Sequence, residues 1–146
     1  MRPIGVTSYN GYPRPMKERL RMAAEAGFTS VLLWWGLGEE EPRFERARLA
    51  REYGLAVGPA HGELDGLNPL WLAEDACAGI LAELRAEIED CARAEAGPLV
   101  LHLTNGNAPP PVSEAGLARF GALIELAERL GVRLAFENVR RAEHLY

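Results

Sequence analysis

The chain has 146 residues, of which 48% are hydrophobic and 25% charged, and its formal net charge is −5. These values fit one globular domain, and the acidic balance argues against a general affinity for nucleic acid or for an anionic membrane. No apolar run approaches the roughly 18–20 residues of a membrane span and no secretory signal opens the chain, so we expect a cytoplasmic protein.

Five short apolar segments are predicted to be strands. They lie near residues 3–7, 29–35, 55–60, 98–103 and 132–137. Each is almost continuously apolar, which is typical of strands in a parallel sheet that is covered on both faces. Because a helical segment separates each strand from the next, we expect right-handed crossovers and the spatial order one to five.

The segments between the strands have helical periodicity. Four helices are expected to end at a glycine in the left-handed conformation, at Gly27, Gly54, Gly97 and Gly131. The third helix is expected to turn its charged residues to water, namely Glu83, Arg85, Glu87 and Glu89. It also carries Cys77 and Cys91, which lie too far apart along one helix to form a disulfide, as expected in a reducing compartment.

The fourth helix shows the clearest start signal. Ser113 is a suitable N-cap, and Glu114 lies in the first turn, where a negative charge is favoured. The spacing predicts that one buried face of this helix is formed by Leu117, Phe120, Ile124 and Ala127.

Two architectures fit this α/β repeat. A doubly wound sheet usually has a glycine-rich turn after its first strand, but residues 8–13 read Ser-Tyr-Asn-Gly-Tyr-Pro. The first unit of a (β/α)8 TIM barrel fits at least as well. Such a barrel needs about 250 residues, so this chain would hold about the first five β/α units.

Three of the predicted strands end in a polar residue: His61, His102 and Glu137. Side chains at the C-terminal ends of parallel strands converge, and imidazole with carboxylate suits a divalent metal or a proton-transfer site. The alternative for each histidine is a core residue bonded to a backbone carbonyl. For Glu137 it is an ion pair with Arg140 or Arg141.

Further candidates flank these positions. Trp34 and Trp35 end the second strand, and one of them must point inward, where it could wall a sugar-sized pocket. We assign that substrate-binding role to Trp35. Asn138 and Arg140 follow Glu137 and are also candidates for substrate binding, the alternative for the arginine being a solvated surface position.

Three stretches resemble one known family. They are residues 61–71 (HGELDGLNPLW), 109–117 (PPPVSEAGL) and 136–145 (FENVRRAEHL), of which the Glu-Asn pair at the end of strand five is the most specific. The family is that of the xylose isomerase-like TIM-barrel proteins, the sugar phosphate isomerases and epimerases related to AP endonuclease family 2, or endonuclease IV. The resemblance runs in order over nearly the whole chain.

The resemblance implies that residues 1–146 are the N-terminal five-eighths of a single TIM-barrel domain, with a divalent metal (Mn, Zn, Mg or Co) at its mouth. It makes Glu137 the metal ligand and, with His102, a catalytic residue. It makes His61 and His102 substrate-binding residues in the sugar enzymes and metal ligands in the endonucleases. The family's other ligands, on later strands, would lie beyond Tyr146.

The leading functional hypothesis is therefore a metal-dependent isomerase or epimerase of a sugar or sugar phosphate, which moves a proton next to a carbonyl. The alternatives are an endonuclease IV-like phosphodiesterase on abasic DNA, which the acidic charge disfavours, and a non-catalytic half-barrel that serves binding or assembly. We expect the chain alone to bind metal weakly or not at all and to be inactive. Its open inner face predicts a homo-oligomer, or a partner that supplies the rest of the barrel, to cover Val6, Val57, Val100 and Ala135.

Overall fold

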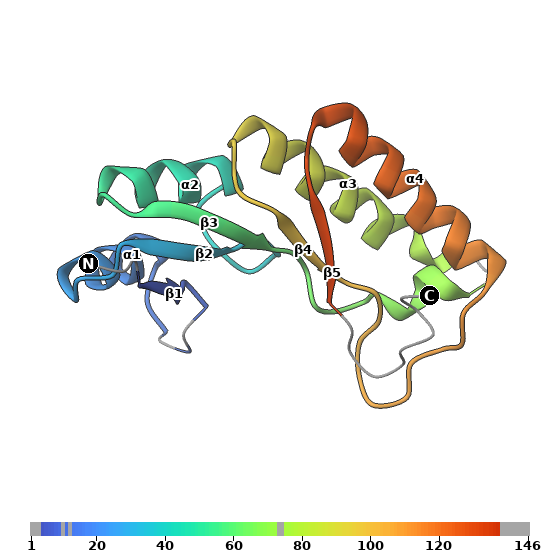
Figure 1. Ribbon diagram of the computed structural model, residues 1–146. Helices are drawn as coiled ribbons and strands as arrows, with labels where there is room; N and C mark the ends of the chain where they lie inside the picture. Colours follow the sequence, from blue (N-terminus) through green and yellow to red (C-terminus); the bar gives the residue numbers. More distant parts are fainter. Residues whose placement is uncertain (1–3, 10, 12, 73–74, 138–146) are drawn as a thin grey trace.

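Five parallel strands alternate with helices along the chain (Figure 1). The computed structural model describes residues 4–9, 11, 13–72 and 75–137. The strands are β1 (Gly5–Thr7), β2 (Ser30–Trp34), β3 (Ala56–His61), β4 (Leu99–His102) and β5 (Leu134–Glu137). The helices are α1 (Met16–Glu25), α2 (Arg43–Glu52), α3 (Ala78–Arg93) and α4 (Glu114–Leu130), and two 3-10 turns, η1 (Asn68–Trp71) and η2 (Asp75–Cys77), precede α3.

The sheet order is β1-β2-β3-β4-β5, with every neighbouring pair parallel. This confirms the predicted order and excludes the reversal that a doubly wound sheet would show at its first strand. The pairing is staggered, because His61 lies level with Val100, whereas His102 lies level with Glu137. Such a stagger between neighbouring strands accompanies the curvature of a barrel.

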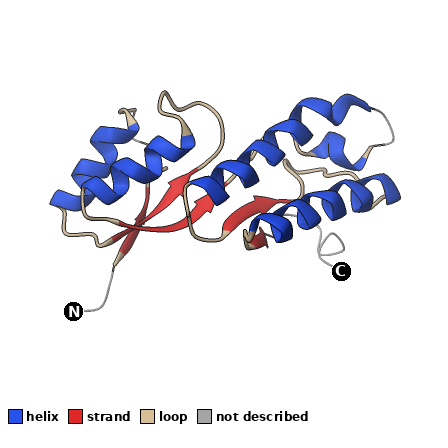
Figure 2. Ribbon diagram, turned by 90° about the horizontal axis from the view of Figure 1, so that it is seen from above, coloured by secondary structure: helices blue, strands red, loops and turns tan. Residues whose placement is uncertain are grey.

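The described helices lie on one face of the sheet. In Figure 1 α2, α3 and α4 lie along one side of the strands, and Figure 2, seen from above, shows the helices in front of them. Side chains on the helix side are almost fully buried: Val31, Leu33, Ala60, Leu99 and Leu101. We call the other side the open face; it carries Leu32, Trp34, His61, Val100, His102, Ala135 and Glu137.

Two valines expected on the open face lie on the other side. Val6 and Val57 both pair with Val31 in β2. Residues directly opposite each other in a sheet point to the same face, and Val31 is 1% exposed against the helices. Val6 and Val57 therefore belong to the helix-covered side, whereas Val100 and Ala135 lie on the open face as predicted.

Three of the four predicted glycine caps are present. Gly27, Gly54 and Gly131 have φ values of 85°, 75° and 69°. After α3 the left-handed residue is instead Glu95, with φ 47°. Gly97 is needed there for another reason, since a Cβ on it would collide with the carbonyl oxygen of Gly58.

The fourth helix is capped as expected but packs differently. Ser113 Oγ accepts the N–H of Gly116 at 3.1 Å. Leu117 and Ile124, expected in the core, are 57% and 37% exposed. The buried residues of α4 are Gly116, Phe120, Leu123 and Ala127.

The two cysteines are free and buried, and Cys77 precedes α3 rather than lying within it. None of the helices in the described part of the chain is long and apolar enough to cross a membrane.

Candidate metal and substrate site

Three polar side chains from different strands meet on the open face. They stand at the C-terminal ends of β3, β4 and β5, where His61, His102 and Glu137 are the last strand residues. Oε2 of Glu137 lies 3.5 Å from Nε2 of His61 and 3.3 Å from Nε2 of His102. One donor atom from each residue lies within 4.8 Å of the other two. The structure therefore brings together the three strand-end residues that the sequence singles out.

The spacing of these donors fits a divalent metal ion. Bonds of about 2.1 Å in a tetrahedral arrangement separate two ligand atoms by about 3.4 Å. Both distances to Glu137 are close to that value, and two imidazoles with a carboxylate are a ligand set of catalytic zinc sites. Three protein donors make a partial shell, so the residues present could hold a metal and leave room for other ligands.

The hydrogen bond of the His61 ring also suits a metal ligand. Its Nδ1 lies 3.1 Å from the carbonyl oxygen of Gly62. A carbonyl can only accept, so in this hydrogen bond Nδ1 carries the proton, and in the neutral form of the ring Nε2 keeps its lone pair. That lone pair faces the carboxylate of Glu137. Two acceptors that face each other require a cation or a shared proton between them.

Trp34, and not Trp35, lies beside the histidines. Its indole is nearly parallel to the His61 ring, and the centroids of these two rings are 6.0 Å apart. The centroid of the Tyr9 ring lies 5.0 Å from that of Trp34. Trp35 is fully buried, and its Nε1 donates to the carbonyl oxygen of Glu87 in α3 at 3.0 Å. The assignment of substrate binding to Trp35 is therefore wrong. Trp34 pairs with His61 across the sheet, which turns the next residue toward the helices.

The accessibility of the three site residues differs. The side chains of His61 and His102 are 18% and 16% exposed, whereas that of Glu137 is 51% exposed. The carboxylate is thus open to a ligand, while the imidazoles are held in the sheet. Asn138 and Arg140, the other predicted substrate-binding residues, lie outside the described residues.

A buried carboxylate that the sequence did not reveal lies behind β3. Glu87 was expected to face water, but its side chain is 0% exposed. Its Oε1 accepts the N–H of Glu63 at 2.8 Å. Burial raises the pKa of Glu87 to about 8, against the opposing influence of Arg43 at 3.9 Å. A spacing signal existed, because Glu87 falls within the buried helical series Leu84, Glu87, Ile88 and Cys91.

Glu63 ties two loops of this region together. Its Oε2 accepts the N–H of Leu37 at 2.9 Å, and its Oε1 accepts the N–H groups of Leu64 and Asp65 at 2.9 and 3.1 Å. Burial would raise the pKa of Glu63, but these three backbone donors outweigh it and hold the pKa below its usual value. An ionised Glu63 therefore fixes the loops that follow β2 and β3.

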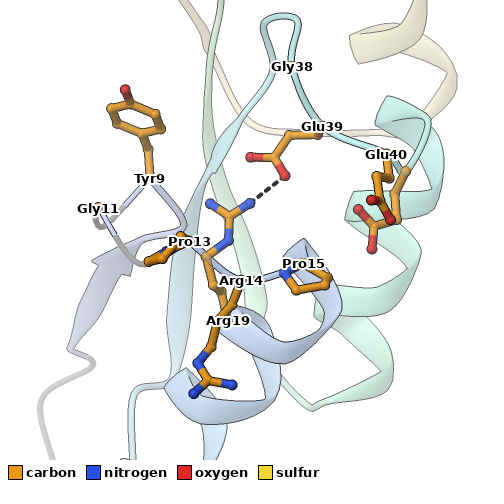
Figure 3. A pocket seen from close by; sticks show the side chains of 10 residues that line it. Tyr9, Gly11, Pro13, Arg14, Pro15, Arg19, Gly38, Glu39 and Glu40 are labelled. Atoms are coloured by element: carbon orange, nitrogen blue, oxygen red, sulfur yellow. Dashed lines mark hydrogen bonds and ion pairs between the residues drawn. The ribbon is translucent and has the colours of Figure 1, made fainter.

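Two of the cavities among these loops adjoin residues named above. The larger, of about 680 Å³, lies between the loops after β2 and β3 and the start of α3, and its lining includes Tyr9, Trp34, Glu39, Glu63, Asp65, Ile80 and Glu83. The smaller, of about 510 Å³, lies at the start of α1, where Arg19 binds Glu39 (Figure 3). Trp34 lines the larger cavity and also flanks His61, so it connects that cavity with the three strand-end residues.

Solved structures share this arrangement of strands and helices. The 3-keto-D-glucoside 4-epimerase of E. coli superposes with a TM-score of 0.68 and 21% identity, over 97% of this chain and 57% of its own. An L-ribulose 3-epimerase superposes with a TM-score of 0.71 and 19% identity, over 95% of this chain and 50% of its own. A xylose isomerase domain protein from Planctomyces limnophilus superposes with a TM-score of 0.68 and 20% identity, over 98% of this chain and 55% of its own. The chain has the fold of the xylose isomerase-like TIM barrels.

The chain spans about half the length of these barrels, in line with five β/α units out of eight. The predicted fold class is thereby confirmed, and the resemblance noted in the sequence holds at the level of the fold. At these identities the similarity shows the fold and not the activity. No protein-family model and no curated protein sequence matches the chain.

Proposed function

We propose that the chain forms the first five units of a metal-dependent sugar isomerase or epimerase that moves a proton next to a carbonyl. The observation that carries this proposal is the convergence of His61, His102 and Glu137 beside the Trp34 ring. The C-terminal ends of the strands are where TIM barrels place their active sites. The names of the solved structures with this fold, which include two sugar epimerases, support the reaction class.

Each residue has a role in this proposal. Glu137 would hold the divalent metal (Mn, Zn, Mg or Co) and moves the substrate proton, with His102 as the second catalytic residue. The metal, when bound, supplies polarisation of the substrate carbonyl. His61 and His102 bind sugar hydroxyls, and the flat ring of Trp34 packs against the apolar side of the sugar. Asn138 and Arg140 are proposed to bind the substrate on the basis of the sequence alone.

The described residues supply only part of such a site. We propose that the remaining strands come from further residues of a longer polypeptide, from another chain or from a second copy. Residues 1–146 alone would then bind the sugar and the metal weakly and would not convert the sugar. A half-barrel that only binds or assembles is the alternative, and the coverage of about half of each matched barrel favours it for the chain by itself.

Deuterium exchange tests the proposal. The natural polypeptide that carries residues 1–146 is incubated in D2O with Mn²⁺ and a panel of ketohexoses and ketopentoses. We expect NMR to show exchange of the proton next to the carbonyl for at least one sugar. Glu137→Gln should lower the rate by about 10²–10⁴-fold, the usual contribution of a general acid or base.

The control for this experiment is Glu125→Gln on α4, because Glu125 is exposed and lies outside the strand-end cluster. Its exchange rate should match that of the unmodified protein. Absence of exchange with every sugar, or exchange that survives Glu137→Gln, would contradict the proposal.

A further inference from the structure

We propose that Glu87 is a positioning residue for His61 and acts through the one peptide unit that joins Gly62 and Glu63. The inference rests on the proposed function only in treating His61 as a site residue. The hydrogen bonds that carry it belong to the chain itself.

A single peptide plane makes both contacts. Its N–H, from Glu63, donates to Oε1 of Glu87 at 2.8 Å. Its carbonyl oxygen, from Gly62, accepts from Nδ1 of His61 at 3.1 Å. A peptide unit is planar and rigid, so an anchor on its N–H also fixes the direction of its C=O. Glu87 therefore determines the direction from which the His61 ring is held.

The contact between the carboxylate and this peptide requires glycine at position 62. A Cβ on Gly62 would collide with Oε2 of Glu87 and would lie 2.7 Å from Cδ2 of Leu101. Glu87 is itself fixed, because its backbone carbonyl accepts the Trp35 indole N–H at 3.0 Å. The hydrogen-bonded chain thus runs from Trp35, the residue after β2, through α3 to the peptide that follows β3.

Packing alone does not account for a glutamate here. Position 87 lies between Leu84 and Ile88 on the buried side of α3, and its side chain is 0% exposed. A leucine or methionine would continue this apolar surface without the cost of burying a carboxyl group. What the glutamate adds is an acceptor for the Glu63 N–H, which would otherwise be a buried and unpaired donor.

The consequence is chemical. With its proton held on Nδ1 by the Gly62 carbonyl, neutral His61 presents the Nε2 lone pair toward Oε2 of Glu137. If that carbonyl is free to turn, the ring can carry its proton on Nε2 instead, which blocks the atom that faces Glu137. Outer hydrogen-bond partners of this kind set the tautomer of metal-binding histidines.

Glu83 provides a matched control one helical turn away. It binds Arg43, which also approaches Glu87 at 3.9 Å and Asp90 at 3.3 Å. Glu83 therefore shares the charge environment of Glu87, while the hydrogen bond to the Glu63 N–H comes from Glu87.

The test is long-range ¹H–¹⁵N NMR of the histidine rings at about pH 8.5, which is well above the pKa of a free imidazole, about 6.5. We expect the unmodified chain to hold His61 in the Nδ1–H form. Glu87→Gln keeps an acceptor oxygen and should preserve that form. Glu87→Leu should shift His61 toward the Nε2–H form, seen as an exchange of the two ring ¹⁵N resonances, while the His102 resonances stay unchanged. In the control Glu83→Leu, the His61 resonances should stay unchanged.

Two results would overturn the inference: an Nε2–H form of His61 in the unmodified chain, or unchanged His61 resonances in Glu87→Leu. The first measurement needs no variant, so it decides even if Glu87→Leu fails to fold. Neither measurement uses a sugar, so the deuterium-exchange experiment can fail while this inference stands, and the reverse.

Discussion

Two glutamates near β3 and β5 show how the surroundings assign different tasks to one residue type. Glu137 is 51% exposed and faces two imidazoles on the open face. Glu87 is fully buried behind β3, its pKa is raised to about 8, and it binds a backbone N–H. The first carboxylate is available to a metal or substrate, and the second is available only to the protein.

The burial of Glu87 predicts a pH-dependent stability. Its pKa rises from 4.5 in the unfolded chain to about 8 in the folded one, so the folded state binds this proton more tightly. The resulting stabilisation is complete below about pH 4.5 and is lost as the pH rises through about 8. At about 1.4 kcal/mol per pKa unit, the loss is on the order of several kcal/mol.

Glu87→Gln should lack this loss, because glutamine does not ionise. The measurement is urea unfolding of both proteins at pH 5 and pH 8.5. We expect the difference in unfolding free energy between the variant and the unmodified chain to grow in favour of the variant at the higher pH. A difference that stays constant with pH would show that Glu87 does not titrate in this window.

The strand-end cluster predicts weak metal binding by residues 1–146 alone. Even if both imidazoles joined Glu137 as ligands, the cluster would have fewer than the four protein ligands of a tight structural site. We expect Zn or Mn to be lost on dialysis, with elemental analysis finding far less than one ion per chain. Stoichiometric metal that Glu137→Gln removes would show that this cluster is a complete site.

At the scale of elements, α4 is held against the loop after β3 by close packing. A Cβ on Gly116 would overlap the Trp71 ring, whose Nε1 donates to the Leu103 carbonyl at 2.7 Å. Ser113 Oγ also donates to the carbonyl oxygen of Trp71 at 2.6 Å. The N-terminal turn of α4 and η1 therefore form one packed unit beside the ends of β3 and β4.

Two glycines of α4 should respond in opposite ways to alanine. Gly116→Ala forces the Trp71 ring to move and should destabilise the chain by about 1–3 kcal/mol, the usual cost of overpacking. Gly121 has open space where a Cβ would stand, so Gly121→Ala should stabilise the helix by up to about 1 kcal/mol. Urea midpoints compare the two variants. Equal effects would contradict the packing described for Gly116.

At the scale of the molecule, several apolar surfaces of the described chain are unmatched. Leu117 and Ile124 on α4 are 57% and 37% exposed, and Ile4 before β1 is 54% exposed. Among the described residues, β1 and β5 each have a neighbouring strand on one side only. Unpaired strand edges and exposed apolar surface are features that proteins normally cover.

We therefore predict that residues 1–146 are not a free monomer when folded. A second copy, or the remaining units of a barrel, should cover the open face and the β5 edge. Light scattering combined with intact mass is the measurement. A stable soluble species of 16.0 kDa, the mass of one chain, would require that another element close the sheet.

The sequence by itself determined the order of the elements and the three strand-end residues of the site. Continuous apolar runs after helix-ending glycines define parallel strands, and parallel strands bring their C-terminal ends to one edge. For this reason His61, His102 and Glu137 could be grouped although dozens of residues separate them, and the five strands lie where they were expected.

Only the tertiary structure decided which way individual side chains face. Alternation shows that Trp34 and Trp35 point in opposite directions, but it is the pairing of Trp34 with His61 that places Trp35 in the core. Likewise, the charge of Glu87 suggests a surface position, and its burial follows from the end of β3 packing over α3. Local sequence fixes periodicity, whereas absolute orientation and burial depend on contacts between distant segments, which periodicity does not encode.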